Sequence, residues 1–447
     1  MHSARLWAGY VPWSFDDGGG CAGAEGAGVA RKAGRSAMMN GELAPLRVAF
    51  VAGLATGGSA RHVAALAAGC RAAGLAVSVL APAPTLALAG TAAGIETFAL
   101  SISERPRPVS DMFAVARLRN RLASWRPDVV HAHGMRAGAV AGLAMTGLAM
   151  TGAASGGLAG TGMTSRGLRN PAQRRRPPAL AVTVHNAPPA GRRGRLVYGV
   201  LERICARRAD LVLCASADLA ARMRDLGAAE VHQFDVPAPV VRQPSRAEVA
   251  QARDDVGAGG RPVVLAVGRL APQKGLDVLI EAAGRWRHRD PQPRTVIAGD
   301  GPLAADLRAR ASRARADVVL LGPRQDVPAL LEIADVVVVP SRWEARALIL
   351  QEAMRAGKPI VATSVGGTPD LVGAHSEDSA SQQDSAMLIP PDDPAALAAA
   401  VTAVLNDPRL AARLRVAART QSATFSTESD AIKAAMSMYA RLAAVRS

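Results

Sequence analysis

Two cations stand close together in the segment VGRLAPQKG, directly after an apolar run that is typical of a buried strand. They are Arg269 and Lys274. Arg offers a fork of donors and Lys a compact charge, so the pair beside glycines suits the two phosphates of a pyrophosphate. The alternative is an ordinary pair of solvated loop cations. The spacing alone therefore indicates a diphosphate site and leaves the simpler interpretation open.

Two carboxylates stand eight residues apart in PSRWEARALILQEAM, at a junction between an expected strand and an expected helix. If the helix begins near Ala345, Glu344 lies in the loop and Glu352 about two turns along, and both can face one cleft. Carboxylates placed in this way can accept hydrogen bonds from sugar hydroxyls. The alternative is a pair of glutamates on a helix surface.

Glycines offer bare backbone amides at two further junctions. Gly366, Gly367 and Thr368 follow the apolar segment IVATSV, and Gly57 and Gly58 precede an expected helix after the first apolar run. Amides at the start of a helix suit an anion. At the first of these junctions the alternative is a common tight turn.

Histidines end two of the apolar runs in the first half of the chain. His133 and His185 hold these positions, and His131 is expected within the strand. Two histidines at neighbouring strand ends indicate a functional pair facing the ligand. A single histidine in such a place is more commonly a structural residue whose hydrogen bonds are satisfied, so that alternative stays open.

Strands alternating with helices must position all of these residues. Apolar strands are expected at 46–53, 76–82, 127–134, 180–186 and 211–216, and a second series begins after the polar segment 241–260 with RPVVLAVGRL. Continuous Val, Ile and Leu strands between helices predict parallel sheets covered on both faces. The predicted fold class is α/β with two doubly wound Rossmann-like domains, in which ligands bind at the carboxyl ends of the strands.

Three segments fall outside this regular pattern. Residues 1–44 lack periodicity and are interpreted as a disordered extension or a misassigned start. Residues 137–165 carry no charge, but they are mostly Gly, Ala, Thr and Ser, and we interpret about 137–178 as a flexible low-complexity insertion rather than a membrane span. Residues 426–447 are expected to form a C-terminal helix that returns toward the N-terminal domain.

The net charge of +16 belongs to the first half of the chain. Residues 45–240 hold 23 arginines against 10 acidic residues. Aromatic residues make up only 3%, which argues against stacking platforms for single-stranded nucleic acid, and no nucleic-acid partner is expected. The charge favours an anionic acceptor or membrane surface.

Residues 192–208 show an amphipathic pattern that fits peripheral contact with anionic lipid. The alternative is a helix packed on the sheet.

Several other classes of site are absent from the sequence. No GxGxxG follows the first apolar strand, where GLATGGSA stands instead. The chain has no P-loop, HExxH, GxSxG or DxD motif, and its four cysteines show no CxxC spacing. We therefore expect no metal and no cofactor. The absence of paired cysteines fits a reducing cytoplasm, so the predicted location is cytoplasmic. If the protein contacts lipid, we expect that contact at the inner face of the membrane.

Taken together, the segments resemble the retaining glycosyltransferases of family 4, whose GT-B fold sets two Rossmann-like domains around a central cleft. The matching segments cover most of 46–410 in the order of that family. They are GGSARHV, PDVVHAHG, TVHN, RADLVLCAS, VGRLAPQKG, AGDGP, LGPRQDVPALLEIADVVVVPSRWE, EAMRAGKPIVATSVGGTPD and IPPDDPAAL. The resemblance implies an N-terminal acceptor-side domain at 45–240 and a C-terminal nucleotide-sugar-binding domain at 250–425.

The resemblance also implies roles for the matching residues. Four residues are expected at the transferred sugar and the leaving diphosphate. His133 would lie beside the sugar and Glu344 would bind its hydroxyls, while Arg269 and Lys274 would hold the diphosphate. Eight are expected to bind the rest of the donor: Gly58 at the diphosphate, Gly322, Pro323 and Arg324 at the base, Glu352 at the ribose, and Gly366, Gly367 and Thr368 against the sugar and phosphate.

The implied activity is metal-independent transfer of a sugar, with retention, from a nucleotide diphosphate sugar to an unidentified acceptor. The acceptor classes left open are a cell-envelope glycolipid, a polysaccharide and a small molecule. The alternative is a catalytically degenerate GT-B scaffold at the cell envelope. Arg346 stands close to Glu344 where glycine is commoner in the family, and it is expected to alter the sugar pocket.

Overall fold

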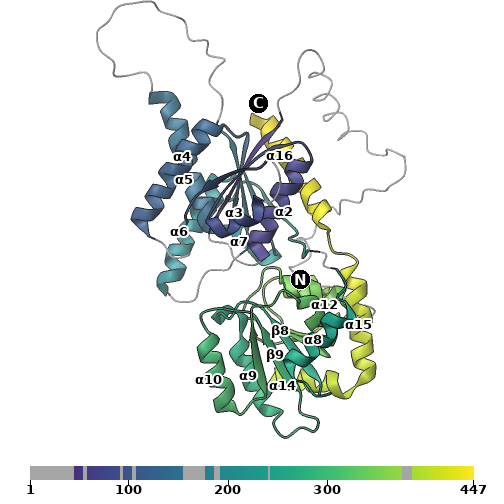
Figure 1. Ribbon diagram of the computed structural model, residues 1–447. Helices are drawn as coiled ribbons and strands as arrows, with labels where there is room; N and C mark the ends of the chain where they lie inside the picture. Colours follow the sequence, from purple (N-terminus) through teal and green to yellow (C-terminus); the bar gives the residue numbers. More distant parts are fainter. Residues whose placement is uncertain are drawn as a thin grey trace, which may run out of the picture. The chain divides into compact units, whose positions relative to one another are not determined.

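The computed structural model describes residues 45–53, 58–90, 94–102, 107–154, 177–185, 192–239, 242–374 and 385–446. The predicted extension at 1–44 lies outside these ranges. Residues 46–447 form one compact unit that contains two parallel sheets (Figure 1). The predicted α/β class of two doubly wound domains is confirmed.

The N-terminal sheet has seven strands within the described ranges, in the order β3-β2-β1-β4-β5-β6-β7. Their bounds are β1 (Arg47–Ala52), β2 (Ala76–Ala81), β3 (Glu96–Ala99), β4 (Val129–His133), β5 (Ala179–Val184), β6 (Leu211–Cys214) and β7 (Val231–Gln233). Every residue of β4 and β5 is buried, as expected for strands covered on both faces. The register pairs Phe50 with His131 and Ala52 with His133.

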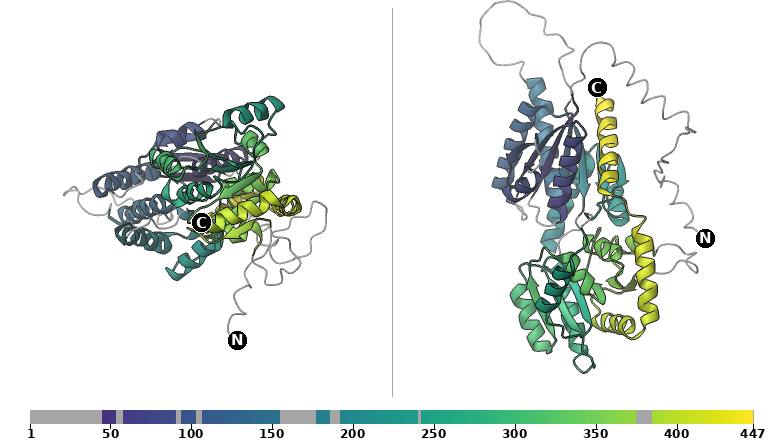
Figure 2. Two further views of the ribbon diagram at one scale, coloured as in Figure 1. Left: turned by 90° about the horizontal axis from the view of Figure 1, so that it is seen from below. Right: turned by 45° about the vertical axis from the view of Figure 1, so that its right-hand side comes forward.

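Two layers of helices cover this sheet. One core contains residues of α4 (Pro108–Trp125), α5 (Met135–Ala154), α6 (Arg192–Arg208) and α7 (Ala217–Asp225). The opposite core contains residues of α2 (Gly58–Ala72), α3 (Ala83–Ala89) and the C-terminal helix α16 (Glu428–Arg446). Helix α16 lies beside α2, as Figure 2 shows, so the end of the chain completes the N-terminal domain.

The C-terminal sheet has six strands in the part of the chain described here, in the order β10-β9-β8-β11-β12-β13. The strands are β8 (Val263–Val267), β9 (Arg294–Ala298), β10 (Val318–Gly322), β11 (Val336–Val339), β12 (Ile360–Thr363) and β13 (Met387–Ile389). Around them lie α8 (Arg246–Val256), the short helix η2 (Pro272–Lys274), α9 (Leu276–Arg285), α10 (Ala304–Ala314), α11 (Val327–Ile333), α12 (Leu348–Arg355), α13 (Thr368–Val372), α14 (Pro394–Asn406) and α15 (Pro408–Ser422).

Local sequence explains several of these boundaries. Ser245 and Glu248 form a capping box that starts α8, which therefore begins inside the segment predicted to be a polar linker. Asp393 and Asp407 accept hydrogen bonds from the first backbone amides of α14 and α15. These caps fix where the helices enter, and so how each one covers the sheet.

The prediction of a flexible insertion is wrong for residues 137–154, because they belong to α5. This helix packs between α4 and α6, and its alanines between Ala137 and Ala144 are almost fully buried. Small residues allow the close approach: a Cβ on Gly138 would meet Val182 and Cys205 at under 3 Å. Residues 155–176 of the predicted insertion lie outside the described residues. Among those described, no helix is long and apolar enough to cross a membrane.

Candidate active site

In both sheets, candidate site residues follow the strands on either side of the point where the strand order reverses. In each sheet the strand order reverses beside the first strand, between β1 and β4 and between β8 and β11. Doubly wound proteins bind ligands outside the carboxyl ends of the strands at this switch point. His133 ends β4, Lys274 follows β8, and Glu344 follows β11. The predicted residues therefore lie where this topology places a ligand.

Lys274 and Glu344 meet at the switch point of the C-terminal sheet. The Lys274 ammonium forms an ion pair with the Glu344 carboxylate, and the Ser341 hydroxyl donates to the same carboxylate at 2.7 Å. The side chain of Glu344 is only 8% exposed and that of Lys274 is 26% exposed. A carboxylate this deeply buried needs a compensating charge, and the Lys274 ammonium supplies it.

Glycines allow the backbone around Glu344 to close tightly. Gly366 has φ +52°, and a Cβ there would lie 2.1 Å from the Glu344 carbonyl oxygen. A Cβ on Gly367 would lie 2.0 Å from the Ala345 oxygen, and one on Gly275 would lie 2.0 Å from the Pro340 oxygen. The Gly367 amide donates to the Glu344 carbonyl at 2.9 Å. These contacts hold the loop that carries Glu344, and any side chain would displace it.

Thr368 and Arg269 complete the predicted diphosphate region. Thr368 begins α13 and is 2% exposed, and its hydroxyl has no hydrogen-bond partner among the described residues. Arg269 is exposed and lies in the loop between β8 and η2. The structure thus places a guanidinium, an ammonium and a buried hydroxyl on the loops that follow β8 and β12.

Glu352 lies on α12, which begins at Leu348 and leaves Ala345 in the loop. Burial raises the pKa of this carboxyl above its usual range, against the opposing effect of Arg61 and Arg355. Arg61 belongs to α2, so a cation of the N-terminal domain lowers the pKa of Glu352 against the effect of burial.

Gly58 begins α2 in close contact with the C-terminal domain. A Cβ on Gly58 would lie 2.4 Å from a methyl group of Leu348, at the first residue of α12. A side chain at position 58 would therefore require the end of the Leu348 side chain to move. Its neighbour Gly57 lies outside the described residues.

The segment expected to border the base follows β10. Gly322 ends the strand with φ +74°, and Pro323 and Arg324 come next. The Arg324 guanidinium binds Asp326 and Asp255, each at 2.6 Å. The side chain of Arg324 is therefore committed to these two aspartates, and what the segment presents to a ligand is chiefly backbone.

Arg346 binds a segment that follows the N-terminal sheet. Its guanidinium lies 2.9 Å from Asp235, which follows β7, and Asp235 also accepts a hydrogen bond from Ser426 at 2.6 Å. This ion pair identifies the partner of Arg346, and the expectation that Arg346 alters the sugar pocket stays a prediction. The residue connects the loop after Glu344 to the two segments that run between the domains.

His133 belongs to a cluster in which His131 and His133 are buried and His62 and His185 are half-buried. Its ring packs on that of His131 at 4.1 Å between centroids, and His62 lies 5.8 Å away. Burial lowers the pKa of His131 to about 3 and those of His62 and His185 to about 4, and it holds the pKa of His133 well below its usual value. The four imidazoles are therefore neutral at physiological pH and can both donate and accept hydrogen bonds.

Two residues of the site were missed from sequence. His62 lies one helical turn after Gly58, inside the segment GGSARHV, and this spacing was an available signal. Gln351 precedes Glu352 and is fully buried, and it bonds to the backbone of Ala238 and Val236 at 3.0 Å each. A buried polar residue on a helix has no sequence signal, because its partners lie more than a hundred residues away.

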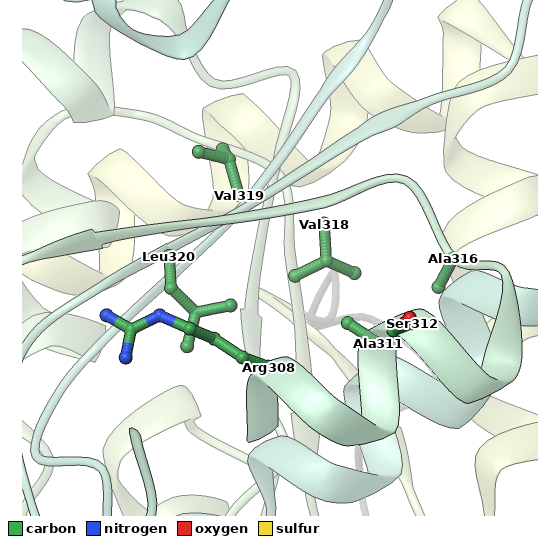
Figure 3. Close-up of a pocket in the computed structure, with 7 residues that line it drawn as sticks. All are labelled: Arg308, Ala311, Ser312, Ala316, Val318, Val319 and Leu320. Carbon is green, nitrogen blue, oxygen red and sulfur yellow. The ribbon is translucent and has the colours of Figure 1, made fainter. Parts of the chain in front are cut away.

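One pocket of the surface lies away from these residues and lacks the side chains expected for sugar or phosphate chemistry. Figure 3 shows a pocket between α10 and the edge strand β10, lined by apolar residues with Arg308 and Ser312 and by neither histidine nor carboxylate. Within the described ranges, no group of three or more His, Cys, Asp or Glu residues could hold a metal ion.

Comparisons with known proteins agree with this arrangement. Residues 57–239 match the family described as glycosyl transferase 4-like domain, and residues 250–421 match the family described as glycosyl transferases group 1. The alpha-D-kanosaminyltransferase of Streptomyces kanamyceticus is 32% identical over 222 residues, which are 48% of this chain and 55% of that protein. The D-inositol 3-phosphate glycosyltransferase of Salinispora arenicola is 37% identical over 202 residues, which are 42% of this chain and 43% of that protein. The chain thus spans about half the length of these relatives.

A solved structure shows the same fold. Anabaena Alr3699/HepE in complex with UDP-glucose superposes with a TM-score of 0.70 at 19% identity, over 89% of this chain and 100% of that one. At this identity the likeness concerns the fold alone, which is the two-domain α/β GT-B arrangement. The predicted fold and family are both confirmed.

Proposed function

The chain belongs to the glycosyl transferases group 1 family, and on that premise we propose that it transfers a sugar from a nucleotide diphosphate sugar to an acceptor, with retention of configuration. The observation that carries this proposal is the Lys274–Glu344 ion pair at the switch point of the C-terminal sheet. It puts a cation for a phosphate and a carboxylate for a sugar side by side, on loops of two neighbouring strands.

Donor binding exchanges the partners of this pair. A diphosphate oxygen takes the Lys274 ammonium, and the Glu344 carboxylate is then free to accept hydrogen bonds from hydroxyls of the sugar. Arg269 adds a second cation, and the Thr368 hydroxyl and the Gly366 amide supply neutral donors. Gly367, whose amide donates to the Glu344 carbonyl, lies against the sugar and holds this loop in place. Cations and dipoles fixed before the reaction stabilise the charge that develops on the leaving diphosphate, so in this proposal neither a metal nor a cofactor is required.

Transfer then proceeds on one face of the sugar. The bond from the anomeric carbon to the leaving phosphate oxygen breaks while the acceptor oxygen bonds to the same face, and the acceptor proton passes to that phosphate oxygen. Neutral His133 hydrogen-bonds the sugar from the N-terminal sheet, and Glu352 holds the nucleotide ribose. Gly58 lets α2 approach the donor, and Gly322, Pro323 and Arg324 border its base.

Release of nucleoside diphosphate from a donor panel tests this function. The panel is UDP-glucose, UDP-N-acetylglucosamine, GDP-mannose and ADP-glucose, each offered with inositol 3-phosphate or with vesicles containing phosphatidylinositol. We expect one donor to react, and the Lys274→Met variant to lose that reaction. The Lys358→Met variant is the control, since Lys358 is a half-buried lysine before β12 whose ammonium donates to the Glu332 carbonyl. A folded scaffold without activity would release no diphosphate from any donor.

We further propose that the acceptor side meets an anionic membrane at its inner, cytoplasmic face. Helices α4 and α6 each expose large apolar side chains close to their N-terminal ends, which lie at the carboxyl edge of the N-terminal sheet. On α4 these are Val109, Met112 and Phe113, from 67% to 74% exposed, and on α6 they are Leu196, Val197 and Val200, from 40% to 72% exposed.

The charge on α6 fits lipid phosphates. Arg195, Arg203 and Arg207 are exposed, while Glu202, the one acid of this helix, is fully buried and paired with Arg222. Exposed apolar side chains beside unopposed arginines are typical of helices that lie in an anionic interface. Flotation of the protein with phosphatidylcholine vesicles, with and without phosphatidylglycerol, tests this surface.

A further inference from the structure

The C-terminal helix reaches the histidine cluster through one side chain. The Tyr439 hydroxyl lies 2.5 Å from Nδ1 of His131, a residue 308 positions earlier in the chain. Both side chains are fully buried. On its other side, Nε2 of His131 lies 2.7 Å from the Thr183 hydroxyl of β5. His131 is therefore held at both ring nitrogens, by a helix of one layer and a strand of the sheet.

Both hydrogen bonds join neutral groups. Burial raises the pKa of Tyr439 well above its usual value, so the phenol keeps its proton. His131 is neutral, and a neutral imidazole carries one proton and one acceptor nitrogen. With the phenol as donor to Nδ1, the imidazole proton is on Nε2 and is donated to the Thr183 hydroxyl. In this arrangement Tyr439 selects the tautomer of His131 as well as holding its ring.

His133 has no such partners of its own. Its ring is 5% exposed, and neither of its nitrogens makes a hydrogen bond to any described residue. Its orientation rests on packing against His131 at 4.1 Å, His62 at 5.8 Å and Phe50 at 6.0 Å between ring centroids. His131 is the nearest of the three rings, so a change in the orientation of His131 alters the closest packing contact of His133.

We propose that Tyr439 is a positioning residue for sugar transfer, which acts by locking His131 and through it the ring of His133. The inference rests on the proposed function, in which His133 touches the transferred sugar. It gives the C-terminal helix a part in the reaction beyond covering the sheet. A helix that follows the C-terminal domain then helps to orient a residue at the switch point of the N-terminal sheet.

Nitrogen NMR of histidine-labelled protein tests the hydrogen bonds without any substrate. In the wild type we expect His131 as the Nε2–H tautomer. In Tyr439→Phe we expect loss of that single tautomer and a shift of the His133 resonances, assigned with His131→Gln and His133→Gln variants. An Nδ1–H tautomer in the wild type, or unchanged His133 resonances in Tyr439→Phe, would overturn the inference even if the enzyme transfers sugar.

Kinetics separate positioning from a purely structural role. With the reactive donor of the panel, Tyr439→Phe and Thr183→Val are each expected to lower kcat about tenfold, the effect of about one lost hydrogen bond, and to leave the donor KM unchanged. The donor KM is unaffected because the charged groups proposed to bind the diphosphate, Arg269 and Lys274, follow a strand of the other sheet. Thr295→Val is the matched control, since Thr295 is an equally buried strand threonine whose hydroxyl has no partner among the described residues.

The kinetic outcomes decide between the two proposals. A loss of kcat in Thr295→Val equal to that in Thr183→Val would refute the positioning role. So would a full effect of Tyr439→Phe in a His131→Gln background, because Tyr439 is proposed to act only through His131. If the wild type reacts with no donor, the proposed function fails, and the NMR result alone decides the link from Tyr439 to His133.

Discussion

The ammonium of Lys274 is ion-paired with the carboxylate of Glu344, 70 residues later, because the loops after β8 and β11 end side by side. The sequence predicts separate roles for the two residues, Lys274 as a cation that binds the diphosphate and Glu344 as a carboxylate that binds the sugar. The structure brings their side chains into contact. The two side chains neutralise each other's charge. In the proposed reaction, donor binding replaces both partners of this pair.

The Lys274–Glu344 pair predicts a strong coupling in stability. Lys274→Met leaves a buried carboxylate uncompensated and is expected to lower the free energy of unfolding by about 3 kcal/mol. Adding Glu344→Gln removes the orphaned charge, so the double variant is expected to recover much of that loss. Urea unfolding of both single variants and the double variant measures the coupling. Lys358→Met is the control, and strictly additive losses would contradict the pair.

Gly366 is predicted to tolerate no side chain. Gly366→Ala places a Cβ 2.1 Å from a backbone oxygen at φ +52°, and we expect a loss of stability of more than about 2 kcal/mol together with loss of donor binding. Gly259→Ala separates the two causes, since Gly259 has φ +57° and an open surrounding. That control is expected to cost about 1 kcal/mol. Equal losses in the two variants would show that contact with Glu344 is not what requires glycine.

The buried histidines predict a loss of stability in weak acid. Their folded pKa values are depressed to about 4 or below, so the stability they contribute is complete above the unfolded pKa of about 6.5 and is lost as pH falls toward 4. Each histidine adds up to about 1.4 kcal/mol per pH unit to the slope in this window. We expect His185→Gln to flatten the slope measured by urea unfolding between pH 4.5 and 7. His288→Gln removes an exposed histidine and is expected to leave it unchanged.

The proposed membrane surface predicts a specific pair of variants. Met112→Ser with Phe113→Ser, and Leu196→Ser with Val200→Ser, are each expected to reduce flotation with anionic vesicles several-fold, because each removes two exposed apolar side chains from the interface. The control is Val416→Ser with Val445→Ser, which removes equally exposed apolar residues from α15 and α16. Equal flotation of the three double variants would place the contact elsewhere.

The apolar strand patterns predicted most of the fold and the sheet edge at which the candidate site residues lie. Continuous apolar runs such as Val336–Val339, bounded by turn residues, are typical of buried parallel strands, and the polar residues that follow such strands gather at one edge of the sheet. Composition misled at α5, because an Ala and Gly helix packed between two others has the same residue content as a flexible segment. The partners of Arg346 and Gln351 could not be inferred, since each lies across a long stretch of chain. The Tyr439 contact with His131 depends on where the last helix returns, which no local pattern states.

Calorimetric titration of nucleoside diphosphates into the wild type and Lys274→Met is the most direct test of the central claim. UDP, GDP and ADP are the ligands, and Lys358→Met is titrated beside them. The account predicts that at least one binds the wild type and Lys358→Met equally, and binds Lys274→Met about 10- to 100-fold more weakly, as expected for a lost contact to a charged group. Equal affinity for wild type and Lys274→Met, or binding of none of the three, would contradict it.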